Sequence, residues 1–277
     1  MQWNLLQCQS SSDIQANLRF IETQLKQLPR HDNEPQLVVL PECSLLFGGH
    51  EAEQLQHAGT DDDNPLADAL ATMAKQYQLY LIAGTMPFKA AKNKVFSRCY
   101  AFDDNGHTLG HYDKMHLFDV DVADGTKTYR ESDTFAAGEQ LTVIDTPFGK
   151  IGLAICYDLR FADLFRALRL MGADIIVLPS AFTKVTGQAH WQVLLQARAI
   201  ENQCFILGAN QWGAHNQGRR ETFGHSMIVD PWGTVLAQKP QQTGWVQVRP
   251  DMRQLQKIRQ NMPVLRHNRF NAPSVTS

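Results

Sequence analysis

The sequence predicts an α/β fold of four layers, an α-β-β-α sandwich built from two similar halves. Two observations predict it. One order of elements (strand, helix, strand, helix, strand, hairpin) occurs twice along the chain. The expected strands are short apolar runs, as is typical of buried strands, and the expected helices are amphipathic. Two such halves bury themselves most simply with their sheets face to face and helices outside each sheet.

The first half contains three expected strands, two helices and a hairpin. A hairpin is expected at Asn105-Gly106, because this dipeptide favours the tight turns that join antiparallel strands. The strands are expected at 3–8, 37–40 and 80–84, and the helices near 14–28 and 66–77.

The second half repeats this order, and Leu-Pro-Ser at 178–180 matches Leu-Pro-Glu at 40–42. Its hairpin is expected around Pro231-Trp232-Gly233, opened by the segment 224–227. The strands are expected at 151–156, 174–179 and 204–208, and the helices at 161–171 and 189–200.

No linker rich in Pro, Gly or Ser separates the halves, so residues 1–277 are expected to form a single domain. The tail after about Asp251 has weak helical periodicity. It is expected to pack on the body of the protein or on a partner subunit.

Composition excludes several classes of function. The chain has 277 residues, of which 43% are hydrophobic, and this favours a globular protein with a sizeable core. The formal net charge is −2 and no long basic run occurs, so nucleic acid is not an expected partner. The pair Arg219-Arg220 is interpreted as solvated charge. No apolar stretch is long enough to span a membrane, and the first residues do not resemble a secretory signal.

The cysteines indicate a reducing compartment. There are five of them, at positions 8, 43, 99, 156 and 204, and none forms a CxxC pair. A disulfide framework is therefore not expected, and the cytoplasm is the expected location. His107 and His111 flank a hairpin arm without a Cys or acidic partner at ligand spacing, so no metal and no cofactor are expected.

Cys156 is the first candidate for chemistry. It ends the apolar run 151–155 and precedes the expected helix 161–171, so it should lie at a strand-to-helix turn. Backbone amides at the start of a helix favour negative charge and hence a thiolate. The alternative is a buried core cysteine.

Two further candidates lie at strand ends. Glu42 follows the strand 37–40, and Lys114 closes the second arm of the hairpin at Asn105-Gly106. Taken singly, these residues could be a solvated strand terminus and an ordinary surface lysine. Together with Cys156 they would supply a general base, a cation and a thiol nucleophile.

Three segments resemble the signatures of the nitrilase superfamily, the carbon–nitrogen hydrolases. They are Pro41-Glu42, Tyr112-Asp113-Lys114-Met115-His116-Leu117 and Cys156-Tyr157-Asp158-Leu159-Arg160-Phe161. Their order and spacing fit, and the resemblance runs from about residue 1 to about residue 265. It implies the same sandwich, a Glu-Lys-Cys triad of Glu42, Lys114 and Cys156, and assembly into a homodimer or a larger even oligomer.

The resemblance also implies how the site acts on an amide. Cys156 would form a thioester, with Glu42 as the proton shuttle. Lys114 and the backbone amide of Tyr157 would hold the oxyanion. Glu131 resembles a second glutamate that positions the lysine and the substrate. Arg160 is expected to form a salt bridge with an acidic neighbour, the alternative being contact with a substrate carboxylate.

Cys8 is an alternative nucleophile, because it occupies the position in the first half that Cys156 has in the second. Its flanking residues do not match the family motif, so Cys156 is preferred. Cys43 is expected to point to the opposite face from Glu42, as neighbours in an extended segment do. Cys99 and Cys204 are expected in the core.

The segments 180–191, 194–203 and 116–132 resemble the deaminated glutathione amidase branch. This implies hydrolysis of deaminated glutathione to α-ketoglutarate and cysteinylglycine. The ω-amidases, which cleave α-ketoglutaramate, are a close alternative, but they tend to differ at Ser180 and Ile200-Glu201. Departures from the branch occur at 123–125 and at Gln196, both expected near the pocket mouth. A catalytically inactive binding scaffold is the third reading, and the intact triad argues against it.

Overall fold

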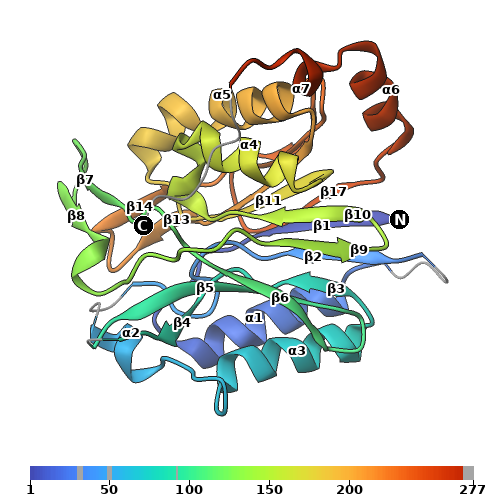
Figure 1. Ribbon diagram of the computed structural model, residues 1–277. Coiled ribbons are helices and arrows are strands. Elements are labelled where there is room, and N and C mark those ends of the chain that lie inside the picture. Colours follow the sequence, from blue (N-terminus) through green and yellow to red (C-terminus); the bar gives the residue numbers. More distant parts are fainter. Residues whose placement is uncertain (30–33, 49–51, 92, 271–277) are drawn as a thin grey trace.

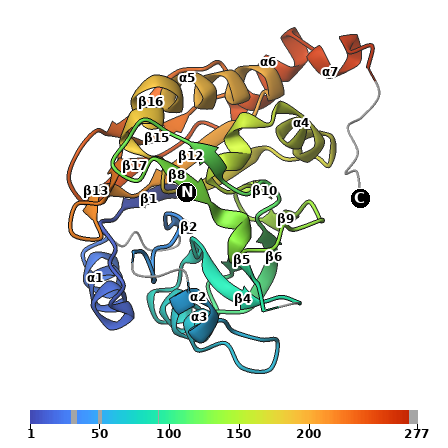
Figure 2. The same cartoon turned by 90° about the vertical axis from the view of Figure 1, so that its left-hand side faces the viewer.

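Two β-sheets lie face to face, and helices cover the outer face of each (Figures 1 and 2). This computed structural model describes residues 1–29, 34–48, 52–91 and 93–270. The predicted α-β-β-α sandwich is therefore confirmed.

The first sheet is built on three parallel strands, β1 (Gln2–Gln7), β2 (Gln36–Val39) and β3 (Tyr80–Ile82). The antiparallel strand β5 (Val95–Phe102) extends it and pairs with β4 (Met86–Lys89) and β6 (Thr108–Asp113). Strands β5 and β6 form the hairpin predicted at Asn105-Gly106. On the outer face lie α1 (Ile14–Lys26) and α3 (Pro65–Tyr77), whose first turns are capped by the side chains of Asp13 and Asn64.

The second sheet repeats the parallel core of the first. Its parallel strands are β10 (Gly149–Leu153), β11 (Ile175–Ser180) and β12 (Phe205–Asn210). The strands β9 (Val143–Thr146), β15 (Ser226–Val229) and β16 (Val235–Lys239) add antiparallel edges. The predicted hairpin at 231–233 joins β15 to β16. The outer face carries α4 (Ala162–Leu170) and α5 (Lys184–Asn202).

Alternating side chains build the core on both faces of the first sheet. In β1, Trp3 and Leu5 point into the core between the sheets, whereas Leu6 packs among the residues under α1 and α3. The Trp3 and Phe205 rings meet edge to face across the two sheets, with centroids 5.1 Å apart. Each sheet is thus apolar on both faces, as the four-layer arrangement requires.

One strand crosses between the halves. Strand β17 (Gly244–Val248) follows the second half in sequence but pairs antiparallel with β1 of the first sheet. Two small hairpins, β7 (Asp119–Asp121) with β8 (Thr128–Arg130) and β13 (Trp212–His215) with β14 (Arg220–Phe223), stand outside both sheets. Sequence patterns did not predict these pairings.

Two predicted elements differ from the structure by more than two residues at one end. The strand predicted at 151–156 ends at Leu153, and Cys156 begins the 3-10 helix η2 (Cys156–Arg160). Helix α5 begins at Lys184 rather than 189, because the Thr183 side chain caps it. The tail forms α6 (Arg253–Asn261) and α7 (Val264–His267), and Leu255 and Arg259 of α6 anchor it to the body. Residues 271–277 of the tail lie outside the described residues.

Candidate active site

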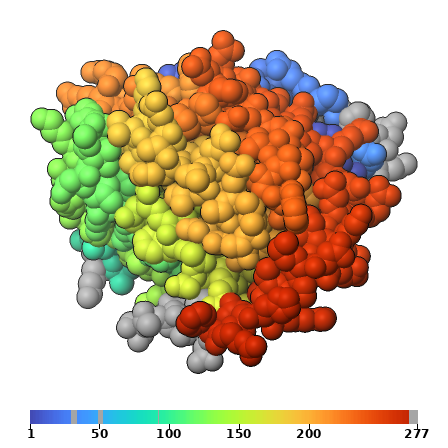
Figure 3. Space-filling view, turned by 90° about the horizontal axis from the view of Figure 1, so that it is seen from above, coloured from blue at the N-terminus to red at the C-terminus, as the bar shows by residue number. Residues whose placement is uncertain are grey.

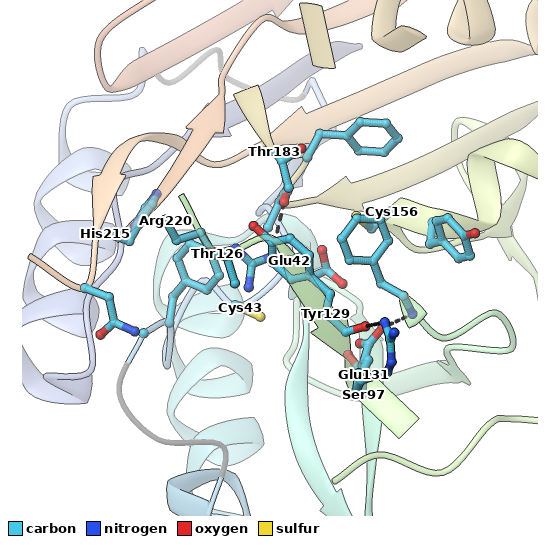
Figure 4. Close-up of a pocket in the computed structure, with 18 of the residues that line it drawn as sticks. Glu42, Cys43, Ser97, Thr126, Tyr129, Glu131, Cys156, Thr183, His215 and Arg220 are labelled. Atoms are coloured by element: carbon cyan, nitrogen blue, oxygen red, sulfur yellow. Dashed lines mark hydrogen bonds between the residues drawn. The ribbon is translucent and has the colours of Figure 1, made fainter. Parts of the chain in front are cut away.

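Glu42, Lys114 and Cys156 line one cavity of about 600 Å³ (Figure 4). Each lies just beyond a strand end, after β2, β6 and β10 respectively. Their side chains are almost fully buried, with residue exposures of 4%, 2% and 7%. The face-to-face sheets thus bring the ends of three strands, far apart in sequence, to one place.

Lys114 lies between two carboxylates. Its Nζ is 2.8 Å from Glu42 Oε1 and 2.9 Å from each carboxylate oxygen of Glu131. Glu131 opens the 3-10 helix η1 (Glu131–Asp133) and also accepts the backbone N–H of Phe118 at 2.6 Å. Both of its oxygens are therefore occupied, and its carboxylate holds the ammonium at a fixed point in the cavity wall.

Charge keeps Lys114 protonated despite its burial. Burial by itself would lower the pKa of Lys114, but the negative charges of Glu131 and Glu42 more than offset it and raise that pKa well above its ordinary value. The group is therefore a permanent cation at neutral pH and can stabilise an anion that forms next to it.

Cys156 has a left-handed backbone, with φ of +45°. This conformation costs a residue other than glycine roughly 1 kcal/mol or more, and such residues concentrate at functional sites. The turn places the side chain in the cavity wall, where Figure 4 shows its sulfur. The prediction that Cys156 sits at a strand-to-helix turn is thus confirmed, with a 3-10 turn in place of the helix start.

The predicted preference of Cys156 for the thiolate is wrong. Burial raises the pKa of its thiol well above the ordinary value, and the charge of Glu42 adds to this, while Lys114 and a hydrogen bond from the Ala181 backbone oppose it. The resting group is a thiol, and its reaction as a nucleophile requires a base.

The other predicted site residues divide into two groups. Tyr157 and Glu131 line the cavity. Arg160 is not among the lining residues; its guanidinium lies 5.7 and 5.6 Å from the ring centroids of Tyr157 and Phe182, and Nη1 is 3.3 Å from Nδ1 of His190. The predicted salt bridge of Arg160 to an acidic neighbour does not occur within the described residues, because its aromatic neighbours occupy that position.

Asp158 joins the turn that begins at Cys156 to the segment that contains Lys114. It is fully buried, and its carboxylate accepts the Tyr112 hydroxyl at 2.8 Å and the Ile155 backbone N–H at 2.8 Å. It also accepts the His116 backbone N–H at 3.2 Å and lies 2.7 Å from that residue's Nδ1. Two of the three family-like segments are therefore fixed relative to each other by one carboxylate.

Cys99 and Cys204 lie in the core as predicted, and so does Cys8, the alternative nucleophile. Cys8, Cys99 and Cys204 are buried in the core, and burial raises the pKa of each thiol. Cys43 differs from the prediction, because it lines the same cavity as Glu42. Its φ of +56° breaks the extended backbone that would have turned the side chain to the other face.

Phe47, His215 and Arg220 also line the cavity, and none of them was predicted to belong to the site. The interpretation of Arg219-Arg220 as solvated charge is wrong for Arg220, which lines the cavity and is only partly exposed, whereas Arg219 lines the cavity but is exposed. The turn residues Asn216-Gln217-Gly218, followed by the alternating Arg220–Phe223, were the signal for a hairpin there.

His215 is a buried neutral histidine. Its Nδ1 lies 2.9 Å from the Ser10 carbonyl oxygen and its Nε2 lies 2.8 Å from the Thr222 hydroxyl. Burial lowers its pKa to about 4, an effect that the Arg220 charge reinforces. The two bonds fit the tautomer with the proton on Nδ1: the Nδ1–H donates to the Ser10 carbonyl oxygen, and Nε2 accepts from the Thr222 hydroxyl.

The His215 pKa makes stability depend on pH. In the unfolded chain His215 binds a proton near pH 6.5, but in the folded protein it does so only near pH 4. The contribution of neutral His215 to the free energy of unfolding is therefore complete above pH 6.5 and is lost as pH falls toward 4. The shift corresponds to about 3 kcal/mol. We expect the unfolding free energy of the wild type to fall by about this amount more than that of His215→Gln between pH 7 and 4. Urea denaturation at both pH values measures it, and parallel losses would contradict the assignment.

The segments that suggested a family branch reach the cavity through Ala181, Phe182, Thr183 and Tyr129, whereas the positions at which the two branches differ, Ser180 and Ile200-Glu201, do not line it. Gly125 lines it, whereas Gln196 donates to the Gly233 carbonyl oxygen at 2.7 Å, so its predicted place at the pocket mouth is wrong. Ile200 and Glu201 lie on the exposed side of α5, and Ser180 is buried beside the cavity-lining Ala181.

No group of metal-binding side chains occurs within the described ranges, and no described helix is long and apolar enough to cross a membrane. His107 contacts Asp103 at 3.2 Å on the surface, whereas the His111 ring packs against Tyr100.

Known proteins resemble this chain over nearly its whole length. The carbon-nitrogen hydrolase family model matches residues 4–260. The deaminated glutathione amidase of Yersinia enterocolitica is 47% identical over 268 residues, covering 96% of this chain and 92% of that protein. One from Synechocystis is 42% identical over 271 residues, covering 96% and 97%. The crystal structure of Saccharomyces cerevisiae Nit3, a nitrilase superfamily member, matches with a TM-score of 0.86 and 29% identity, covering 98% and 97%. The chain therefore belongs to the carbon–nitrogen hydrolase family and is an amidase-type hydrolase.

Proposed function

We propose that this protein hydrolyses deaminated glutathione to α-ketoglutarate and cysteinylglycine. The observation that carries the proposal is the close likeness, at 47% and 42% identity over 96% of the chain, to two proteins named deaminated glutathione amidase. The cavity of about 600 Å³ lies within the range that binds small organic ligands, and it is lined by charged groups suited to a substrate with carboxylates.

The proposed reaction begins with Cys156 and Glu42. Glu42 takes the thiol proton as the sulfur attacks the amide carbon, which suits a thiol whose pKa is raised by burial. The oxyanion forms beside Lys114 and the backbone amide of Tyr157. Glu42 then gives its proton to the leaving nitrogen, the C–N bond breaks, and a thioester and the free dipeptide remain.

Water completes the reaction. Glu42 takes a proton from a water molecule that attacks the thioester, and the oxyanion forms at the same point as before. The C–S bond breaks, the proton returns to sulfur, and α-ketoglutarate leaves. Glu131 acts as a positioning residue, because its two oxygens hold the Lys114 ammonium. None of these steps requires a metal or a cofactor.

An ω-amidase activity on α-ketoglutaramate is the alternative. The segment Thr186-Gly187-Gln188-Ala189-His190-Trp191, which that group shares, favours it. The structure gives the glycine of this segment a packing reason, because a Cβ on Gly187 would lie 2.3 Å from Cβ of Phe223. Gly187 of the shared segment is therefore explained by the contact between α5 and β14, without reference to the substrate.

Kinetics with both substrates test the assignment. Purified protein is expected to hydrolyse deaminated glutathione with the higher kcat/KM, measured by release of α-ketoglutarate. If α-ketoglutaramate is turned over ten-fold better, a difference of about 1.4 kcal/mol in transition-state stabilisation, the ω-amidase alternative takes its place.

We also propose that the protein is a cytoplasmic homodimer or larger even oligomer of single-domain subunits. Helix α5, the β15–β16 hairpin and the tail gather on one face, seen in Figure 3. Exposed apolar side chains occur on this face at Val193, Ile200, Trp232 and Leu236. Such side chains commonly mark protein interfaces. A monomeric mass by light scattering at micromolar concentration would contradict the assembly.

A further inference from the structure

Arg220 lines the cavity without an acidic partner among the described residues. It opens β14, and its guanidinium carbon lies 4.7 Å from the ring centroid of Phe47 and 5.4 Å from that of Tyr129. Within the described part of the chain, its buried Nε has no hydrogen-bond partner, and Nη2 contacts only the Ala181 carbonyl oxygen at a long 3.5 Å. Two aromatic rings thus hold a guanidinium whose donors are largely unused.

The nearby carboxylates are bound elsewhere. Glu221 pairs with Lys184 at 2.7 Å, and Asp124 accepts the Tyr129 hydroxyl at 2.9 Å. Glu131 is held by Lys114. A buried donor without a partner is costly, and the planar fork of arginine matches a carboxylate with two parallel hydrogen bonds. An anionic group of a ligand would therefore complete this wall of the cavity.

The position of Arg220 indicates which part of the substrate it meets. Glu42 must protonate the leaving nitrogen, so the leaving group lies on the Glu42 side of the scissile bond. Arg220 belongs to this side: it lines the cavity together with Cys43, the residue next to Glu42, and Figure 4 draws both away from Cys156. Figure 4 shows Arg220 and His215 across the cavity from Cys156. Thr126 and Arg219, which line the same wall, are exposed, so this wall borders the open rim.

We propose that Arg220 is a specificity residue that binds the terminal carboxylate of the leaving group. It would favour amides whose nitrogen carries a short peptide ending in a carboxylate over primary amides. Two extended residues span roughly 7 Å, which is the reach available to cysteinylglycine from the scissile nitrogen. The inference deepens the proposed function and rests on it.

Comparing wild type and Arg220→Gln on substrates with and without the leaving-group carboxylate tests the contact between Arg220 and that carboxylate. The substrates are deaminated glutathione, its analogue with a C-terminal carboxamide in place of the glycine carboxylate, and α-ketoglutaramate. Arg220→Gln is expected to lower kcat/KM for deaminated glutathione by about 10- to 100-fold, because charge-assisted hydrogen bonds are lost. For the wild type, replacing the carboxylate by the carboxamide is expected to lower kcat/KM by a similar factor. For Arg220→Gln, the same change of substrate is expected to lower kcat/KM little further.

α-Ketoglutaramate distinguishes a contact with the leaving-group carboxylate from a contact with the acyl-side carboxylate. It carries the acyl-side carboxylate but no leaving-group carboxylate, so its turnover by Arg220→Gln is expected to stay within about threefold of wild type. Equal losses with all three substrates would overturn the inference in favour of an acyl-side contact. No loss with any of them would overturn it as well.

Two variants serve as controls. Arg220→Lys keeps the charge without the fork and should recover part of the activity on deaminated glutathione. Arg253→Gln removes an exposed arginine outside the cavity and should behave as wild type. If Arg220→Gln does not fold, the wild type alone still tests the contact. Equal kcat/KM for deaminated glutathione and for its carboxamide analogue would refute it. If the wild type does not hydrolyse deaminated glutathione at all, the proposed function itself fails.

Discussion

Cys156→Ala is expected to lower kcat/KM for deaminated glutathione by at least about 10⁴-fold while leaving the fold intact, because loss of a nucleophile removes the covalent route altogether. The side chain is small and lies at the cavity wall, so stability should change little. Release of α-ketoglutarate measures activity, and circular dichroism with a urea midpoint measures the fold. Intact-mass spectra of the wild type during turnover should show the acyl-thioester adduct, which the variant should lack.

Cys8→Ala is the matched control, because Cys8 holds the equivalent place in the other half and is 1% exposed in the core. It should keep most of the activity at a modest cost in stability. The reverse outcome, an active Cys156→Ala and an inactive Cys8→Ala, would show that the nucleophile is Cys8, in the first half of the repeat. A wild type that turns over no amide and whose Cys156 resists iodoacetamide would favour the binding-scaffold reading.

Lys114→Met is expected to damage both stability and catalysis. It leaves Glu42 and Glu131, which share one ammonium at 2.8 and 2.9 Å, as unpaired carboxylates inside the protein. Breaking a buried ion pair in this way typically costs about 3–5 kcal/mol. Loss of one oxyanion donor typically costs about 10²- to 10³-fold in kcat. Urea denaturation and steady-state kinetics measure the two effects.

The double variant Lys114→Met/Glu131→Gln separates these effects. Removing one of the stranded carboxylates should recover a large part of the stability, whereas the activity should stay low because the cation is still absent. The instability of Lys114→Met relative to wild type should also shrink as pH falls, since a buried unpaired carboxylate has a raised pKa and protonation relieves it. Recovery of activity along with stability would show that Lys114 acts only by holding the fold together.

Local patterns in the sequence were sufficient to predict the fold and the positions of the three central residues. Apolar runs and the Asn105-Gly106 turn depend on neighbours a few residues apart, so the six parallel strands, the helices α1, α3, α4 and α5 and both hairpins were found close to their observed bounds. Glu42, Lys114 and Cys156 each follow such a run. Once two face-to-face sheets are inferred, strand ends are the natural meeting place for these side chains.

Tertiary structure alone decided what depends on distant contacts. The pairing of β17 with β1 joins residues more than 230 positions apart, and no local pattern records it. The left-handed φ at Cys43 turns its side chain into the cavity, against the alternation expected of an extended segment. Burial likewise opposes the thiolate that the amides of the turn were expected to favour at Cys156, because desolvation depends on every chain segment packed around the sulfur.

Arg220 shows the same limit at the level of function. In the sequence it is one of two adjacent arginines on a polar stretch, and the ordinary interpretation is solvated charge. In the structure Phe47 and Tyr129, from segments 173 and 91 positions away, enclose its guanidinium and leave its Nε without a partner. A charge becomes a recognition group through its surroundings, and those surroundings exist only after the chain has folded.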